Sequence, residues 1–147
     1  MSGSVSEKLL EVSDYDKEGY SPVVDYGAWR VAVLNYSNDL LPEKITAMQR
    51  HNETDEVFVL LSGRCILFIG DGDNKITDIF AENMQPLKIY NVKKSVWHSH
   101  TLSRDAKLLI VENRDTTFDN SPFCPLTDIQ QKMIADMTLN LWVDQEI

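Results

Sequence analysis

The 147-residue chain is long enough to bury a hydrophobic core within a single domain, without disulfides or a structural metal. Its formal net charge of −9 comes from 23 acidic against 14 basic residues, and no long basic run could follow a phosphate backbone, so nucleic acid is not an expected partner. No apolar run approaches the roughly 20 residues of a membrane span, and the first residues lack the pattern of a secretory signal, so we expect a cytoplasmic protein.

The first twenty residues are acidic and weakly patterned, which predicts an arm that is ordered only where it docks. After this arm, short runs rich in β-branched and aromatic residues alternate with turn-forming clusters. We expect seven strands, at residues 29–36, 57–63, 64–70, 76–80, 87–92, 96–102 and 107–113. Such even spacing of short strands favours a sandwich or barrel over alternating strands and helices.

The C-terminal segment predicts one helix. Thr127 and Gln130 have the spacing of a capping box, and apolar residues then recur every four positions, at Ile129, Met133, Met137 and Leu141, with Ile134 beside them. We expect this stripe to pack on one face of a sheet, in this subunit or in a partner. The predicted organisation is an arm over residues 1–20, a barrel core over 21–115, and a loop with the packed helix over 116–147.

Candidate ligands crowd the segment before the strand at 57–63, namely Gln49, His51, Glu53, Asp55 and Glu56. Because side chains alternate along a strand, Glu56 shares a face with Phe58 and Leu60, and the turn at 52–55 can bring it back beside Gln49 and His51.

Two more candidates lie on a later strand, where His98 and His100 share one face as an imidazole pair. Taken singly, each candidate also has an ordinary structural role, as a solvated loop residue, a surface carboxylate or a core histidine. The turn residues Glu53 and Asp55 are of the kind that is usually just solvated.

The segment from Gln49 to Asn113 resembles the cupin superfamily. Glu56, followed after six residues by Gly63 and preceded by His51, is similar to the first cupin motif, G(X)5HXH(X)3-4E(X)6G. His98 resembles the histidine of the second motif, G(X)5PXG(X)2H(X)3N.

The chain departs from both motifs. Gln49 occupies the position of the first histidine, and the leading glycine is replaced by Glu43. The glycines, proline and asparagine of the second motif are replaced, by Leu87, Lys93, Ser95 and Leu102. The resemblance implies an all-β fold, a cupin-type double-stranded β-helix or jelly-roll barrel, to which this chain adds a C-terminal α-helix.

The resemblance also implies a divalent metal ion, such as iron, manganese, nickel or zinc, bound by His51, Glu56 and His98. Two imidazoles and a carboxylate suffice for such an ion and leave open positions. Gln49 would add a carbonyl oxygen or orient a water, or His100 would replace the missing imidazole. His100 or Glu53 would move a proton during catalysis.

Three functions of different classes stay open from the sequence. One is a metal-dependent dioxygenase, isomerase or decarboxylase acting on a small carboxylate or sugar-like compound. The others are a non-catalytic ligand-binding cupin and a metal-free sugar isomerase or epimerase.

Two expectations concern the state of the protein. We expect a homodimer, because the strands at Val57–Leu61 and Val96–Thr101 carry apolar or aromatic residues on their outer faces. We also expect Cys65 and Cys124 to be free thiols.

Overall fold

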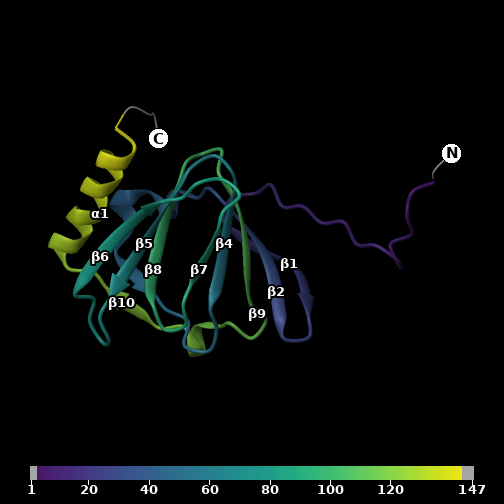
Figure 1. Ribbon diagram of the computed structural model, residues 1–147, viewed down its shortest axis with the longest axis horizontal. Coiled ribbons are helices and arrows are strands. Elements are labelled where there is room, and N and C mark those ends of the chain that lie inside the picture. Colours follow the sequence, from purple (N-terminus) through teal and green to yellow (C-terminus); the bar gives the residue numbers. More distant parts are fainter. Residues whose placement is uncertain (1–2, 144–147) are drawn as a thin grey trace.

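The computed structural model describes residues 3–143 as two antiparallel five-stranded sheets with one α-helix outside them (Figure 1). Sheet A has the strand order β1-β2-β9-β4-β7, and sheet B has the order β10-β3-β8-β5-β6. The strands are β1 (Tyr20–Tyr26), β2 (Trp29–Asn35), β3 (Ala47–Gln49), β4 (Glu56–Ser62), β5 (Cys65–Asp71), β6 (Asp78–Asn83), β7 (Ile89–Val92), β8 (Trp97–Leu102), β9 (Lys107–Asn113) and β10 (Phe123–Pro125). The predicted all-β jelly roll with a C-terminal helix is confirmed.

All seven predicted strands are present, with ends shifted by up to three residues. Three strands were not predicted: β1, β3 and β10. The first contains a proline and the other two have three residues each, so none of them shows a strong alternating pattern. Because β10 pairs with β3, residues 116–147 contribute a strand to sheet B as well as the expected loop and helix.

The main core lies between the two sheets. On β4 the side chains of Glu56, Phe58 and Leu60 are buried, as the alternation predicts, whereas Leu61 is 43% exposed. Phe58 and Leu60 belong to an apolar cluster contributed by both sheets, including Leu67 of β5 and Leu108 of β9. Burial of this layer supplies the main stabilising free energy of the barrel and holds both sheets in fixed register. Glu56 extends the same face into a polar region.

The glycine of the first motif has a steric role. Gly63 follows β4 with a φ of +70°, in the left-handed region that residues with a Cβ rarely adopt. A Cβ atom added there would lie 2.5 Å from the Cα atom of Ala106. The spacing E(X)6G thus connects an inward-facing carboxylate at the start of β4 with the tight turn at its end.

Helix α1 (Asp128–Leu141) begins where the capping box predicts. The Thr127 hydroxyl accepts the backbone N–H of Gln130, and the Gln130 side chain accepts the N–H of Thr127. The predicted contact stripe is confirmed only in part, because Ile134 and Met137 are packed, whereas Ile129 is 75% exposed and Leu141 is 41% exposed.

The helix packs through the predicted Ile134 and Met137 and also through Thr138, together with Trp142 just beyond its end. Thr138 can take a buried position because its hydroxyl donates to the Ile134 carbonyl, 2.8 Å away. This face packs into an apolar cluster of sheet B that also contains Trp97, which is 3% exposed. The outer surface at Trp97 is therefore covered within this chain, and it no longer supports the predicted homodimer.

The N-terminal segment contains no strand or helix from residue 3 to residue 19 and runs away from the barrel (Figure 1). Its base is attached to β2, because the Asn35 amide donates to the carbonyls of Tyr15 and Lys17, each at 2.8 Å. Both cysteines are free and buried, as predicted. No helix among residues 3–143 has the length and apolar composition needed to span a membrane.

Candidate metal site and cavity

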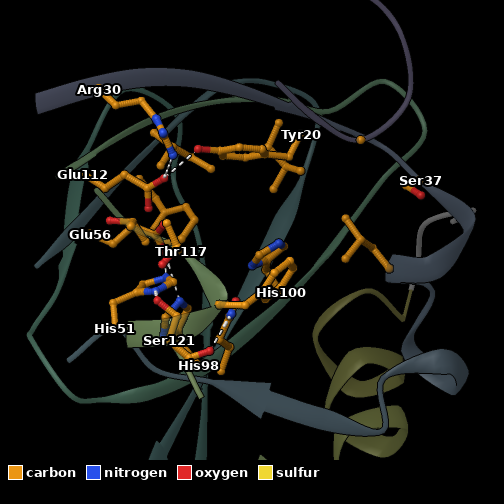
Figure 2. A pocket seen from close by; sticks show the side chains of 18 of the residues that line it. Tyr20, Arg30, Ser37, His51, Glu56, His98, His100, Glu112, Thr117 and Ser121 are labelled. Atoms are coloured by element: carbon orange, nitrogen blue, oxygen red, sulfur yellow. Dashed lines mark hydrogen bonds and ion pairs between the residues drawn. The ribbon is translucent and has the colours of Figure 1, made fainter. Parts of the chain in front are cut away.

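A cavity of about 680 Å³ lies against the inner face of the barrel (Figure 2). Its lining comes from both sheets and from the segment around the short 3-10 helix η3 (Phe118–Asn120). This volume is in the usual range for small-molecule sites. The polar residues that line the cavity include Tyr20, Arg30, Gln49, His51, Glu56, His98, His100, Glu112 and Ser121. All three histidines of the chain line the cavity.

Three of the predicted ligands converge. Glu56 starts β4 in sheet A, His98 belongs to β8 in sheet B, and His51 lies in the loop between β3 and β4. The Oε1 atom of Glu56 is 2.9 Å from Nε2 of His98 and 3.3 Å from Nε2 of His51. All three side chains are buried, and one ligand atom from each lies within 4.8 Å of the others.

The hydrogen bonds on the far side of the two rings determine which ring nitrogens carry hydrogen. Nδ1 of His98 is 3.0 Å from the carbonyl oxygen of Val96, which can only accept, so Nδ1 is the protonated nitrogen. Nδ1 of His51 is 2.7 Å from the hydroxyl of Ser121, which itself donates to the side-chain oxygen of Asn120. In their neutral forms, both imidazoles therefore direct the lone pair of Nε2 toward Glu56.

Three electron-pair donors thus face one another without a hydrogen between them, and such an arrangement requires a cation or additional protons. Burial alone would raise the pKa of Glu56, but the hydrogen bonds from His51 and His98 outweigh it and hold that pKa well below its usual range. Two neutral imidazoles and one carboxylate also form a set that suits a divalent transition metal, so the residues fit such an ion.

A second carboxyl group, which the sequence interpretation missed, lies beside the first. Glu112 is the last inward residue of β9, and its Oε1 atom accepts the Tyr20 hydroxyl at 2.6 Å and lies 3.7 Å from a guanidinium nitrogen of Arg30. Burial, then the hydrogen bond and charge of Glu56, raise the pKa of Glu112 to about 8. Glu112 therefore holds a proton at neutral pH. Its alternation with Leu108 and Ile110 in the predicted strand was the signal that could have found it.

Gln49 lies in the cavity wall, opposite His98 in the pairing of β3 with β8. Its amide nitrogen donates to the Ser121 carbonyl at 3.0 Å. Within the described residues, no hydrogen bond involves its side-chain oxygen, which is the atom predicted to complete the metal site.

His100 also lines the cavity but is not one of the three converging groups. Its ring lies beside Phe58, with 5.7 Å between the ring centroids, and its Nδ1 atom is buried without a hydrogen-bond partner in residues 3–143. Burial, then the charge of His98, lower the pKa of His100 to about 4, so this ring is neutral at neutral pH.

The two turn carboxylates lie elsewhere. Glu53 is exposed and does not line the cavity, and its carboxylate accepts the Asn120 amide at 3.2 Å. The structure therefore does not bring Glu53 to where the predicted proton transfer would occur. Asp55 accepts the backbone N–H of Lys94 at 2.7 Å and the amide of Asn91 at 3.0 Å, which stabilises the turn before β8.

Comparison with known proteins gives no match by sequence, either to a protein-family model or to a curated protein. Solved structures do match. A cupin-2 domain protein from Shewanella frigidimarina aligns with a TM-score of 0.50 and 18% identity, over 67% of this chain and 85% of its own. A uridine complex of Pac13 from Streptomyces, a nucleoside dehydratase, aligns with a TM-score of 0.53 and 9% identity, over 81% and 87%.

The iron(II) form of HppE aligns with a TM-score of 0.51 and 19% identity, over 63% of this chain and 48% of its own. The fold and the converging histidine and glutamate side chains define the class as a cupin-type barrel with a candidate metal site. The chain has the fold of the cupin superfamily, so the resemblance in its motifs is confirmed at the level of the fold.

Proposed function

We propose that the barrel binds a small molecule at a divalent metal ion held by His51, Glu56 and His98. The observation that supports this most directly is the convergence of two Nε2 lone pairs and a carboxylate oxygen, with each ring turned by a hydrogen bond on its far side. When bound, such an ion acts as a Lewis acid toward a ligand oxygen. The donor set suits iron, manganese, nickel or zinc, and the neighbour HppE is an iron(II) protein.

The cavity lining favours a compact ligand with oxygen atoms at one end. Beyond the polar residues its wall is apolar, with Leu34, Leu40, Phe58 and Ile110. We propose a small carboxylate or sugar-like molecule, whose oxygens lie at the triad and whose carbon skeleton contacts the apolar wall. Neutral His100 provides one hydrogen-bonding nitrogen to that ligand.

We further propose that the protein is an enzyme whose chemistry includes a proton transfer, as in isomerases and decarboxylases. Glu112 lines the cavity and holds a proton at neutral pH, with Tyr20 donating a hydrogen bond to it. A carboxyl group with a pKa near the working pH can give up and recover a proton during a reaction. The deep position of Glu112 makes it a better candidate for this role than Glu53.

Glu112 also supports a second candidate, which is proton-transfer chemistry on a sugar or nucleoside without a metal. The neighbour Pac13 is a nucleoside dehydratase with uridine complexes among its structures. In this alternative the triad binds ligand hydroxyls directly, and the Glu112–Tyr20 pair carries the proton. A third outcome, a ligand-binding protein without turnover, shares the cavity and differs only in forming no product.

Cobalt(II) spectroscopy tests the first candidate against the others. Metal-depleted protein is loaded with Co²⁺, and small hydroxy acids, keto acids, sugars and nucleosides are titrated in turn. We expect visible absorption bands from a low-symmetry site, a change in these bands with at least one ligand, and about tenfold tighter ligand binding than in the metal-depleted protein. Equal binding without metal would favour the metal-free candidate, and binding without product by NMR would favour the ligand-binding protein.

We also keep the homodimer as a proposal, now based on the outer face of sheet A alone. Leu61 of β4 is 43% exposed there, and Ile89 of β7, which pairs with Val59 of β4, is 75% exposed. Exposed apolar residues on adjacent strands are typical of an interface. A monomer at micromolar concentration in analytical ultracentrifugation would contradict this proposal.

A further inference from the structure

The most complete hydrogen-bond chain at the site runs outward from His51 and ends at the protein surface. Nδ1 of His51 contacts the Ser121 hydroxyl at 2.7 Å, and this hydroxyl contacts the side-chain oxygen of Asn120 at 3.0 Å. The Asn120 amide nitrogen then donates to the carboxylate of Glu53 at 3.2 Å. Ser121 is 1% exposed and Glu53 is exposed, so the chain joins the buried site to the surface.

The direction of each bond follows from Asn120. Its amide nitrogen donates to two oxygens that can only accept, those of the Glu53 carboxylate and the Asp115 carbonyl. Its side-chain oxygen accepts the backbone N–H of Thr117 at 3.0 Å, which fixes the orientation of the amide. The Ser121 hydroxyl has a single hydrogen, and it must go to that oxygen because two oxygen lone pairs would otherwise face each other. Toward His51, Ser121 therefore offers only a lone pair.

Backbone contacts hold this segment in place. The Asn120 carbonyl accepts the N–H of Asn52 at 3.0 Å, and the Ser121 carbonyl accepts the side chain of Gln49 at 3.0 Å. The Pro122 carbonyl accepts the N–H of Arg50 at 3.2 Å. Residues on both sides of His51 are thus bonded to residues on both sides of Ser121, so the hydroxyl cannot move away from the ring without breaking these bonds.

We propose that Ser121, oriented by Asn120, is the positioning residue that keeps His51 protonated on Nδ1 and so presents its Nε2 lone pair to a metal ion. This inference rests on the proposed metal site and assigns a role to residues that have none in it. The two imidazole rings are oriented by different groups. His98 is oriented by a backbone carbonyl, which substitution does not remove, whereas His51 is oriented by a side chain. The Glu53 carboxylate accepts a hydrogen bond from Asn120, and Asn120 keeps a second acceptor in the Asp115 carbonyl.

Replacing Ser121 tests the assignment with a measurement that needs no metal. Histidine side-chain ¹⁵N shifts are recorded for metal-depleted protein at alkaline pH, so that the neutral tautomers are compared. In the wild type, the short 2.7 Å contact to Ser121 should outweigh the longer 3.3 Å contact to Glu56, giving the Nδ1–H form of His51. In Ser121→Ala the proton should move to Nε2 and donate to Glu56. Asn120→Ala should give a mixture, because it frees the serine hydroxyl to rotate.

Zinc affinity provides the second measurement. Ser121→Ala should weaken Zn²⁺ binding by about 10- to 100-fold, as expected when the partner of a ligating histidine is lost. Ser121→Thr, which keeps a hydroxyl, should restore the Nδ1–H form and most of the affinity. Ser103→Ala is the matched control, because Ser103 is also buried and its hydroxyl bonds to Asp105 in the turn after β8. Circular dichroism verifies that each variant is folded.

The outcomes separate the inference from the proposed function. An Nδ1–H form of His51 in both Ser121→Ala and Asn120→Ala, with unchanged zinc affinity, would overturn the positioning role and leave the metal site standing. A wild type that binds no zinc would overturn the metal site, while the ¹⁵N shifts would still decide whether Ser121 sets the tautomer. Loss of zinc affinity without a change of tautomer would also contradict the inference.

Discussion

The metal-depleted wild type should lose stability as pH rises, and replacing Glu112 with glutamine should remove this loss. The pKa of Glu112 is about 8 in the folded protein, against an ordinary value of 4.5. Between these values the folded protein holds one more proton than the unfolded chain, so raising the pH favours unfolding. One proton corresponds to about 1.4 kcal/mol per pH unit. Because Glu112 lines an open cavity, solvent screening makes the slope smaller than this, and we expect a loss of roughly 1–2 kcal/mol from about pH 5.5 to 7.5.

Urea unfolding at several pH values measures this difference. Glutamine keeps an oxygen to accept the Tyr20 hydroxyl and an N–H to donate to Glu56, but it cannot ionise. As the pH rises, the free energy of unfolding of Glu112→Gln should therefore fall less than that of the wild type. The free energy of unfolding of Glu53→Gln, a change at an exposed carboxylate, should depend on pH in the same way as that of the wild type. Parallel curves for Glu112→Gln as well would refute the reasoning, because Glu112 would then hold no displaced proton.

Three further predictions follow from the site and the fold. Zinc affinity should fall as pH falls, because an imidazole that carries hydrogen on Nε2 cannot bind the ion there; an affinity that stays constant on acidification would contradict this. Glu53→Ala should change zinc affinity by less than about threefold, because Asn120 keeps the Asp115 carbonyl as an acceptor, and a larger loss in the same titration would make Glu53 part of the site. Ile134→Ala should cost about 2–5 kcal/mol in urea unfolding and Ile129→Ala less than about 0.5, whereas equal costs would mean that the packed face of α1 is misassigned.

The triad could be predicted because each part of it has a local signal. The spacing from Glu56 to Gly63 is set by the length of one strand and by a turn that excludes a Cβ atom. Alternation along β4 and β8 then fixes which side chains face inward, whatever the rest of the chain does. The same rule placed His100 on the cavity wall with His98.

The partners of the triad had no such signal. Ser121 lies 70 residues from His51 and reaches it only because β10 pairs with β3. Tyr20 meets Glu112 across 92 residues, through the pairing of β1, β2 and β9. Contacts of this kind depend on sheet order, which local pattern does not determine.

The helix shows a different limit. Its cap is a local device, and the capping box gave its start correctly. The buried face was predicted only in part: Ile134 and Met137 are packed, but Thr138, a polar residue, takes a buried position by bonding to its own helix, while the apolar side chain of Ile129 stays exposed. A spacing of four between apolar residues therefore does not by itself identify the buried face of a helix in which a short polar residue can also be buried.

Metal content after purification tests the central claim most directly. Wild-type protein and His98→Ala are purified in parallel without chelators, reloaded with Zn²⁺, desalted and analysed by mass spectrometry for metals and by circular dichroism for fold. We predict about one divalent ion per chain in the wild type and a small fraction of that in His98→Ala, with the same β-rich spectrum for both. A wild type that stays metal-free after reloading, or a folded His98→Ala that keeps full occupancy, would contradict the assignment of His51, Glu56 and His98 as a metal site.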